Sequence, residues 1–427
     1  MLDSGEDIYA LARLLFPICR SITGEGVRRT LRLIQERLPA LRIREIPAGT
    51  QCFDWKIPRE WNIRDAYVLD PEGKKIVDFQ ASNLHVVGYS TPVDAEMELD
   101  ELEQHLYSLP DQPTAIPYVT SYYQERWGFC IPHVLRQSLR AGRYRVKIDS
   151  DFSSGSMTFG EYVLPGETDR EVLLSTYICH PSMANNEVSG PCVTTFLGEW
   201  LASLPRRRYT YRIVFVPETI GSICYLSLNH QAMKQRVAAG FNVTCVGDDR
   251  TYSYLPSRAE NTLADRTALH VLHHVYPGFQ RFSYRDRGSD ERQYCSPGID
   301  LPVVSVMRSK YGCYPEYHTS LDDLSLISPA GLFGAYGALV RCLQCLEADF
   351  VPRATVCCEP QLGKRGLYPT LSAKGSAAGV RAMMDLLAYA DGRLSLLAIA
   401  DKIEVPMWDL IPIAERLCTE GLLERVS

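Results

Sequence analysis

Residues 176–190, which read T-Y-I-C-H-P-S-M-A-N-N-E-V-S-G, hold side chains whose types and spacing suit metal or acid–base chemistry. His180 follows an apolar run of strand type, and Asn186 and Glu187 precede a pattern with helical spacing. Ligands of open α/β sheets gather at the carboxyl ends of the strands, and histidine with a nearby carboxylate suits zinc. A core histidine beside an Asn-Glu pair that caps the helix explains this stretch equally well.

Four further polar segments fall where strands of such a sheet would end. They are residues 214–219, 247–249, 288–292 and 314–320. Each segment on its own reads as a loop of solvated charges. A histidine or an acid after each of several successive strands is a less common pattern, and such side chains meet at one edge of the sheet. Together the segments therefore predict one shared site.

These segments must be positioned by an alternation of strands and helices. Apolar runs of strand type cover residues 157–163, 171–178, 209–216, 241–246 and 301–307. Helical patterns cover residues 188–204, 221–237, 261–275 and 329–347. Alternation of this kind predicts an α/β core with a mostly parallel mixed sheet.

The predicted core is discontinuous. It comprises residues 1–50 and 146–351, and a small α+β domain is inserted at residues 51–145, where short aromatic and β-branched runs are cut by proline and glycine. Within this insert, residues 94–107 have a helical pattern. We expect the insert to cover the site and to exclude long chains.

The last part of the sequence differs in composition. Residues 352–378 contain several prolines and a Ser/Ala/Gly cluster and read as a linker, and residues 379–427 resemble a winged helix. Acidic residues outnumber basic ones over 391–427, whereas contacts to DNA phosphates need lysine and arginine. We therefore expect a protein–protein or interdomain module rather than a reader of nucleic acid.

The overall composition limits the classes of function. The 427 residues carry a formal net charge of −6, which argues against a nucleic-acid-binding protein and favours a small substrate. The N-terminal M-L-D-S-G-E-D lacks the basic segment of a signal peptide, and no apolar run is long enough to cross a bilayer. The cysteines are scattered through apolar runs, as in reduced proteins. We expect a cytoplasmic protein without a membrane partner. The sequence leaves open whether the protein forms a homo-oligomer.

Taken in order, the motifs H-P, N-x-x-S-G, P-E-T-x-G-S, S-D-E and Y-H-T-S-x-D resemble those of the zinc aminopeptidases of the co-catalytic clan. More closely, the chain resembles an aminopeptidase-like bacterial family with an inserted small domain and a C-terminal winged helix. Proteins of that family are often labelled for polysaccharide or natural-product biosynthesis. Four further segments resemble the sequence pattern of that family: R-S-I-T-G-E-G, F-D-W-K-I-P-R-E-W, Y-V-T-S-Y-Y and G-S-D-E-R-Q-Y. The resemblance therefore covers residues 6–427.

The resemblance implies a zinc-aminopeptidase-like α/β core and roles for three residues. His180 and His318 take the places of the first and the last metal-binding histidine. Glu218 takes the place of the general base, which removes a proton from the attacking water.

The resemblance departs from the family pattern at the carboxylates that hold two metal ions. Asn186 stands at the place of the bridging carboxylate, and Thr219 and Thr244 stand where two further acids are expected. Neutral side chains compensate two divalent cations poorly, so we expect one zinc ion. Both histidines and Glu187 would hold that ion, with a water in the open position, and Asn186 is a further candidate ligand.

Other residues of these segments are candidates for substrate binding. Asp290 and Glu291 are placed to accept the α-amine that an aminopeptidase substrate carries. Arg308, Arg20 and Tyr317 are candidates to bind a carboxylate or the developing oxyanion. Structural ion pairs explain these residues equally well.

The sequence thus predicts a zinc-dependent, aminopeptidase-like hydrolase that cleaves an N-terminal residue or an amide from a small peptide-like or aminoacylated metabolite, in a biosynthetic pathway. Metal-dependent aminoacyl transfer or cyclisation at the same site is one alternative. A non-catalytic ligand-binding or regulatory protein is another. Bound metal and turnover would separate the hydrolase from the non-catalytic protein.

Overall fold

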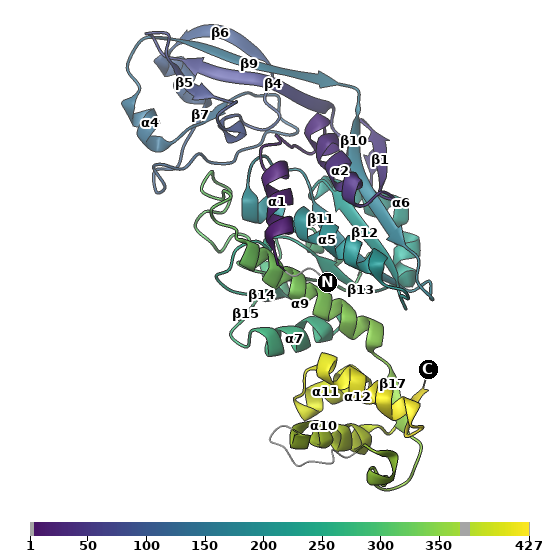
Figure 1. Cartoon of the computed structure of the whole chain (residues 1–427). Helices are drawn as coiled ribbons and strands as arrows, with labels where there is room; N and C mark the ends of the chain where they lie inside the picture. Colours follow the sequence, from purple (N-terminus) through teal and green to yellow (C-terminus); the bar gives the residue numbers. More distant parts are fainter. Residues whose placement is uncertain (1–3, 368–375, 427) are drawn as a thin grey trace. The chain divides into compact units, whose positions relative to one another are not determined.

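The structure is a computed structural model that describes residues 4–367 and 376–426 (Figure 1). The chain divides into two compact units. The first comprises Met1–Asp265 and Gln280–Tyr336, and the second comprises Arg266–Phe279 and Gly337–Ser427. Among the described helices, none combines the length and the apolar character that crossing a bilayer requires.

The first unit is built around an eight-stranded mixed sheet with the strand order β1-β10-β12-β11-β13-β16-β14-β15. In that order the strands span Arg42–Pro47, Ser156–Leu164, Thr210–Val216, Glu171–Tyr177, Val237–Asn242, Val303–Met307, Ser253–Leu255 and Gln280–Arg281. The central strands β12, β11, β13 and β16 pair in parallel, whereas β10 and β14 run antiparallel to β12 and β16. Every residue of β11 is buried, as expected for a strand covered on both faces. This is the mostly parallel mixed sheet that the sequence predicts.

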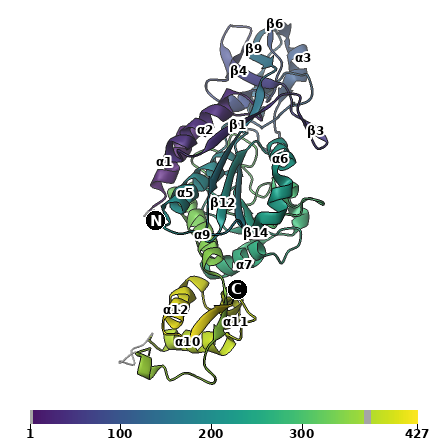
Figure 2. The ribbon, with the colours of Figure 1, turned by 90° about the vertical axis from the view of Figure 1, so that its right-hand side faces the viewer.

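Helices cover both faces of this sheet. α1 (Glu6–Leu15), α2 (Glu25–Arg37) and α5 (Ser189–Ser203) lie on one face, and α6 (Ile220–Arg236) lies on the other (Figure 2). The apolar side chains of α6 join those of β11 and β12 in one buried cluster. The sheet and its helices therefore form the rigid base from which the loops at the strand ends project.

Most predicted elements of this unit are confirmed to within a few residues, but the strand predicted at 241–246 is wrong. The strand there, β13, ends at Asn242 and begins with the sequence Val-Ala-Ala-Gly. Alanine and glycine are depleted in strands, so the sequence pattern did not predict that the strand begins at Val237. Small residues are required because the strand is crowded: a Cβ on Gly240 would lie 2.8 Å from Val303 Cγ2.

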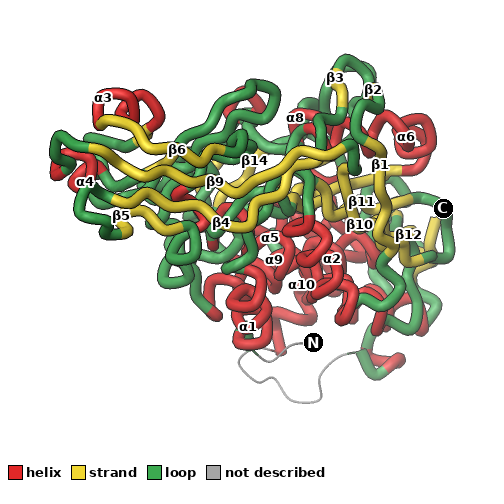
Figure 3. Tube along the Cα trace, turned by 90° about the horizontal axis from the view of Figure 1, so that it is seen from above, coloured by secondary structure: helices red, strands yellow, loops and turns green. Residues whose placement is uncertain are grey.

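A second, antiparallel sheet has the order β5-β4-β9-β6 (Figure 3). It has its own buried apolar core. In that order its strands span Lys75–Asp78, Glu60–Leu69, Arg143–Ser153 and Val93–Glu98. β9 continues past residue 145 without a break. The predicted limits of the insert, 51 and 145, stay a prediction.

The helix predicted over 94–107 is wrong for most of its length. Residues 93–98 form β6, which pairs with β9 along its whole length, and only Leu99–Leu102 forms an α-helix, α3. Alternate side chains of β6 pack on the core of the small sheet. The alternation of buried and exposed side chains in β6 covers only three inward positions. The residues after it have helical spacing, so the sequence pattern predicted a helix for the whole stretch.

The second unit contains a small helical domain with a two-stranded sheet. α10 (Ser376–Tyr389), α11 (Leu396–Ile403) and α12 (Met407–Thr419) pack on one another, and β17 (Val351–Ala354) pairs antiparallel with β18 (Leu423–Val426). Three helices closed by a small antiparallel sheet fit the predicted winged helix. Of the predicted linker at 352–378, residues 368–375 lie outside the described part of the chain.

Two glycines allow a test of packing at the start of α5. A Cβ on Gly190 would lie 2.5 Å from both Thr176 Oγ1 and the Val243 carbonyl oxygen, whereas a Cβ on Gly337, inside α9 (Pro329–Ala348), would meet nothing within 4 Å. We expect Gly190→Ala to lower the free energy of unfolding by about 1–3 kcal/mol through overpacking. Gly337→Ala should raise it by up to about 1 kcal/mol, because alanine favours the helix. Thermal denaturation followed by circular dichroism measures both, and equal shifts in the two variants would contradict this account.

Candidate active site

His180, Glu218 and His318 line one cavity of about 300 Å³. His180 follows β11, Glu218 follows β12, and His318 lies in the loop between β16 and α9. β11 and β12 are neighbouring parallel strands, so their carboxyl ends deliver the first two side chains to the same edge of the sheet. The structure thus brings together three of the residues that the sequence indicates.

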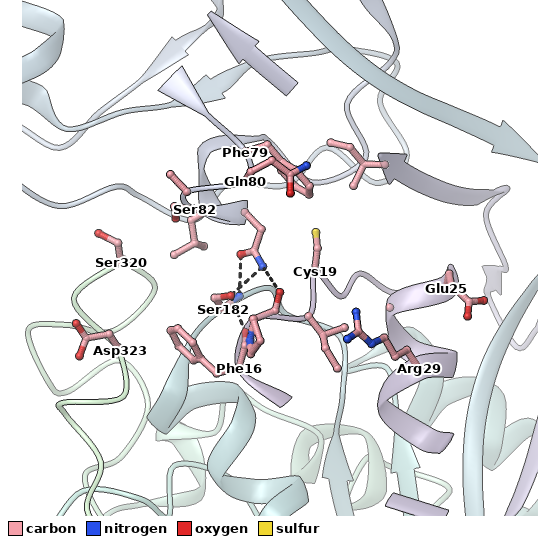
Figure 4. A pocket seen from close by; sticks show the side chains of 17 residues that line it. Phe16, Cys19, Glu25, Arg29, Phe79, Gln80, Ser82, Ser182, Ser320 and Asp323 are labelled. Atoms are coloured by element: carbon pink, nitrogen blue, oxygen red, sulfur yellow. Dashed lines mark hydrogen bonds between the residues drawn. The ribbon is translucent and has the colours of Figure 1, made fainter. Parts of the chain in front are cut away.

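A separate cavity of about 510 Å³ lies near the same loops (Figure 4). Ser182 and Ser320, each two residues beyond one of the histidines, contribute to its wall. Asn83 fixes Ser182, since its Oδ1 accepts from the Ser182 backbone N–H at 3.0 Å and its Nδ2 donates to Ser182 Oγ at 2.8 Å. No titratable residue of the smaller cavity lines this one.

Glu187 and Arg20 hold the ring of His180 on its Nδ1 side. Glu187 Oε2 lies 3.0 Å from His180 Nδ1, and Glu187 Oε1 accepts a hydrogen bond from Arg20 Nε at 3.0 Å. Arg20 also donates to the backbone oxygen of His180 at 3.0 Å and to that of Leu15 at 2.7 Å. With Nδ1 occupied, Nε2 is directed to Glu218, whose Oε2 lies 3.6 Å away.

This placement revises the predicted roles of Glu187 and Arg20. Both side chains are 1% exposed and neither lines the cavity. Glu187 orients the imidazole of His180, as carboxylates behind metal-binding histidines do. Arg20 neutralises Glu187 and does not face a substrate.

Cys179, His180 and Glu187 form a buried group whose potential metal-binding atoms lie within 4.8 Å of one another. Burial raises the pKa of the Cys179 thiol to about 11, so the thiol keeps its proton at neutral pH. The guanidinium of Arg20 already supplies the positive charge beside Glu187. A metal ion at this group would have to displace the thiol proton and compete with the buried Arg20 for Glu187, whereas Nε2 of His180 lies on the side of Glu218 and the cavity.

The charges of the cavity depend on one another. Burial opposes a charge on His180, but Cys179 and Glu187 outweigh it and raise the pKa of His180 well above its ordinary value. Burial also raises the pKa of Glu218, and the charge of His180 counteracts part of this rise. Ser289 Oγ donates a hydrogen bond to Glu218 Oε1 at 2.9 Å.

His318 is strained and has an unused nitrogen. Its φ of 58° lies in the left-handed region, which residues other than glycine adopt at an energetic cost. Its ring stacks on Tyr317 at 3.9 Å, and its Nε2 is buried without a hydrogen-bond partner among the described residues. Burial and the charge of His180 lower the pKa of His318 to about 3, so the imidazole is neutral and keeps a lone pair. Tyr317 supports this ring and does not line the cavity.

The loop that carries His318 is bonded to a loop of the insert. Tyr118 donates its backbone N–H to the His318 oxygen at 2.9 Å, and Ser320 donates its own to the Ile116 oxygen at 2.9 Å. The Tyr118 ring lies 5.1 Å from the rings of both His180 and His318. The insert therefore forms part of the wall around the two histidines.

Asn186 lies in a π-helical turn, Ala184–Val188, that precedes α5. Its Nδ2 donates to Tyr177 OH at 2.6 Å, and its Oδ1 is buried without a partner among the described residues. Asp322 holds this turn, because its carboxylate accepts the backbone N–H groups of Ala184, Asn185 and Asn186 at 3.1, 2.6 and 2.9 Å. Asp322 is the final residue of the motif Y-H-T-S-x-D, but no role was predicted for it.

The predicted acceptors of a substrate amine face the protein interior. Glu291 Oε1 accepts from the Gly288 and Ser289 backbone N–H groups and from Tyr311 OH, and its Oε2 accepts from Asn242 Nδ2. Every oxygen of Glu291 is therefore engaged.

Asp290 and Arg308 also lie away from the cavity wall. Asp290 Oδ1 accepts from the Thr219 backbone N–H and from Ser222 Oγ, each at 2.7 Å. Burial and the charge of Glu218 raise the pKa of Asp290 to about 8. The guanidinium of Arg308 lies over the Tyr252 ring at 3.9 Å. The predicted substrate contacts of Asp290, Glu291 and Arg308 are corrected accordingly.

Other residues of the cavity wall were not predicted as site residues. They are Ile22, Trp55, Tyr118, Thr120, Tyr122, Tyr123, Cys179, Thr219, Ile220 and Arg292. All four aromatic ones belong to the segments Y-V-T-S-Y-Y and F-D-W-K-I-P-R-E-W. Those motifs were signals that could have indicated a role in the site.

Comparison with known proteins gives two family matches. Residues 9–349 match the family described as Domain of unknown function (DUF4910), and residues 351–425 match a winged helix-turn-helix family. A curated relative from Clostridium acetobutylicum is 43% identical over 406 residues, which cover 94% of this chain and 92% of that protein. It is named a polysaccharide biosynthesis protein with aminopeptidase-like domain.

Solved structures show the same architecture. A crystal structure described as a peptidase from Clostridium acetobutylicum has a TM-score of 0.93 and 42% identity, and the match covers 99% of this chain and 96% of that chain. A zinc aminopeptidase from Bacillus subtilis has a TM-score of 0.59 and 11% identity, covering 80% of this chain and 95% of that chain. The second likeness concerns the fold alone.

Proposed function

Because the chain belongs to the aminopeptidase-like family described as Domain of unknown function (DUF4910), with a C-terminal winged helix, we propose that it is a metal-dependent amide hydrolase. Its substrate would be a small peptide-like or aminoacylated metabolite of a biosynthetic pathway. The observation that carries this proposal is the convergence of His180 Nε2, Glu218 and the unpartnered His318 Nε2 on one cavity.

The two histidines of this cavity are side chains of a type that zinc binds. A buried imidazole nitrogen without a partner is costly unless it binds a proton, a water or a metal, and His318 presents such a nitrogen in its neutral form. His180 Nε2 is directed by the carboxylate behind it, which is the usual arrangement for a metal-binding histidine. His180 and His318 would hold the ion, and Asn186 Oδ1 is a further buried acceptor.

A second ion lacks ligands. Thr219 Oγ1 accepts a hydrogen bond from Arg292 Nη2 at 2.6 Å, and Thr244 Oγ1 lies 2.5 Å from Tyr177 OH. Neither side chain supplies a negative charge. Two divalent cations would therefore face Glu218 as the one carboxylate among the described residues of the cavity wall.

The chain's own residues support hydrolysis of an amide bond. A zinc ion bound here would act as a Lewis acid that polarises the amide carbonyl and acidifies a water. Glu218 is the residue placed to accept the proton of the attacking water, since burial raises its pKa and makes it a stronger base. It would then return that proton to the leaving nitrogen, so that a C–O bond forms, the C–N bond breaks, and an acid and an amine result. Ser289 keeps the carboxylate oriented through its hydrogen bond to Oε1.

Metal content tests the proposal directly. We expect about one zinc per chain by elemental analysis of the purified protein and of a His133→Ala control, because His133 bonds Ser108 in the insert and does not line the cavity. His180→Ala and His318→Ala should each lose the metal. Absence of stoichiometric metal in the unaltered protein after incubation with zinc would contradict the proposal. The cavity would then fit the non-catalytic, ligand-binding alternative.

A further inference from the structure

The cavity wall has an unusual charge distribution for an aminopeptidase. The α-amine of an aminopeptidase substrate is a cation at neutral pH and needs an acid to bind it. Along the described wall, Glu218 is the one carboxylate, and it faces His180. Asp290 and Glu291 do not line this wall. Both oxygens of Glu291 accept hydrogen bonds inside the protein, and Asp290 Oδ1 accepts two, while Asp290 Oδ2 is buried without a partner among the described residues. No described acid of the wall remains for an amine.

Arg292 supplies the opposite charge at the same wall. It is exposed, and it forms no ion pair with any residue in the described ranges. One hydrogen bond, from Nη2 to Thr219 Oγ1 at 2.6 Å, fixes the guanidinium at the start of α6. An arginine fork has five donors, so it keeps the pair of parallel N–H groups that a carboxylate accepts.

The remaining wall is largely aromatic. Tyr118, Tyr122, Tyr123 and Trp55 contribute aromatic rings, and the hydroxyls of Tyr118 and Tyr122 lie 3.1 Å apart. Trp55 also lines an adjoining cavity of about 390 Å³, together with Phe53 and with Ile223 and Leu226 of α6. A substrate with an apolar side chain or acyl group suits such walls.

We propose that the substrate is an N-acylated amino acid or a similar anionic amide, whose carboxylate binds Arg292 and whose nitrogen is acylated rather than a free amine. This inference rests on the proposed function and narrows it. The attacked carbonyl is that of the acyl group, and the leaving nitrogen is that of the amino acid. Arg292 is a binding and positioning residue in this scheme, because it holds the end of the substrate that does not react.

Three matched probes test the charge preference with the zinc-loaded full chain. They are N-acetyl-L-phenylalanine, which is an anion, N-acetyl-L-phenylalaninamide, which is neutral, and L-phenylalaninamide, which carries a free amine. Isothermal titration calorimetry should give the anion a Kd about 2- to 5-fold lower than the neutral amide, as expected for an ion pair with an exposed arginine. Arg292→Gln should abolish that difference, and Arg292→Lys should restore part of it. Arg285→Gln is the control, since Arg285 is an exposed arginine of the same segment that does not line the cavity.

Tighter binding of L-phenylalaninamide than of the anion would overturn the inference, and so would an unchanged preference in Arg292→Gln. Absence of measurable binding of the anion to the unaltered protein counts against it as well. These outcomes are independent of the proposed function, which fails if metal and turnover are absent while the anion still binds. Turnover of L-phenylalaninamide alone would keep the hydrolase and reject the anionic substrate.

Discussion

Replacing Glu218 with glutamine is expected to lower kcat for the best amide substrate by about 100- to 10,000-fold, the usual contribution of a general base. The amide of glutamine fills nearly the same volume but accepts no proton. Ser289 can still donate to its oxygen, so the cavity keeps its shape. We expect circular dichroism and zinc content to remain those of the unaltered protein, and KM to change little.

The matched control for this variant is Glu316→Gln. Glu316 lies in the loop that carries His318, but it pairs with Arg250 at 2.8 Å and does not line the cavity. Its replacement should leave kcat within about twofold, as surface ion pairs contribute little. Full activity of Glu218→Gln would reject Glu218 as the base. A loss of zinc together with activity would instead make Glu218 a ligand.

Replacing Asp322 with alanine is expected to lower the free energy of unfolding by about 2–5 kcal/mol. The Asn185 and Asn186 backbone N–H groups and Tyr314 OH would lose their acceptor inside the protein, and each unsatisfied buried group costs about 1–3 kcal/mol. Ala184 loses less, because its N–H also donates to the Asp322 backbone oxygen at 2.8 Å. Urea denaturation at pH 7.5, with the folded and unfolded states monitored by fluorescence, measures the loss.

Asp323→Ala is the control for this second variant. Among the described residues, the Asp323 carboxylate accepts from the N–H and hydroxyl of Ser325 alone, so its loss should cost less than about 1 kcal/mol. Asp322→Asn should fall between the two, because an amide keeps one of the two accepting oxygens. Equal stability of Asp322→Ala and Asp323→Ala would show that the π-helical turn does not depend on the carboxylate.

The sequence indicates those site residues whose place follows from the sheet. His180 and Glu218 stand at the ends of neighbouring parallel strands, and any α/β sheet brings such positions together. The fold class followed from the same alternation of strands and helices. The role of Glu187 could not be read in this way, because its partner Arg20 lies 167 residues away along the chain. Only the folded structure shows that one oxygen of Glu187 is hydrogen-bonded to Arg20 and the other to His180.

The substrate wall was harder to predict than the catalytic centre. Arg292, Asp290 and Glu291 are consecutive in a loop with three charges, and spacing alone does not say which of them faces the cavity. In the structure the short helix α8 (Glu291–Tyr294) turns Glu291 inward and leaves Arg292 at the wall. Loops of this kind have no periodicity from which the direction of a side chain follows.

The backbone bonds between residues 116–118 and 318–320 have a consequence for how the chain folds. The hydrogen bond from the Ile116 N–H to Ser320 Oγ closes a separation of 204 residues, and contacts of such long range form late because the loop must close first. A chain still on the ribosome can complete the small sheet and the strand that carries His180 well before His318 has been added. At that stage the polypeptide can have a complete small sheet while its cavity still lacks His318. Under the proposed function, it becomes active only after residues 318–320 have docked on the insert.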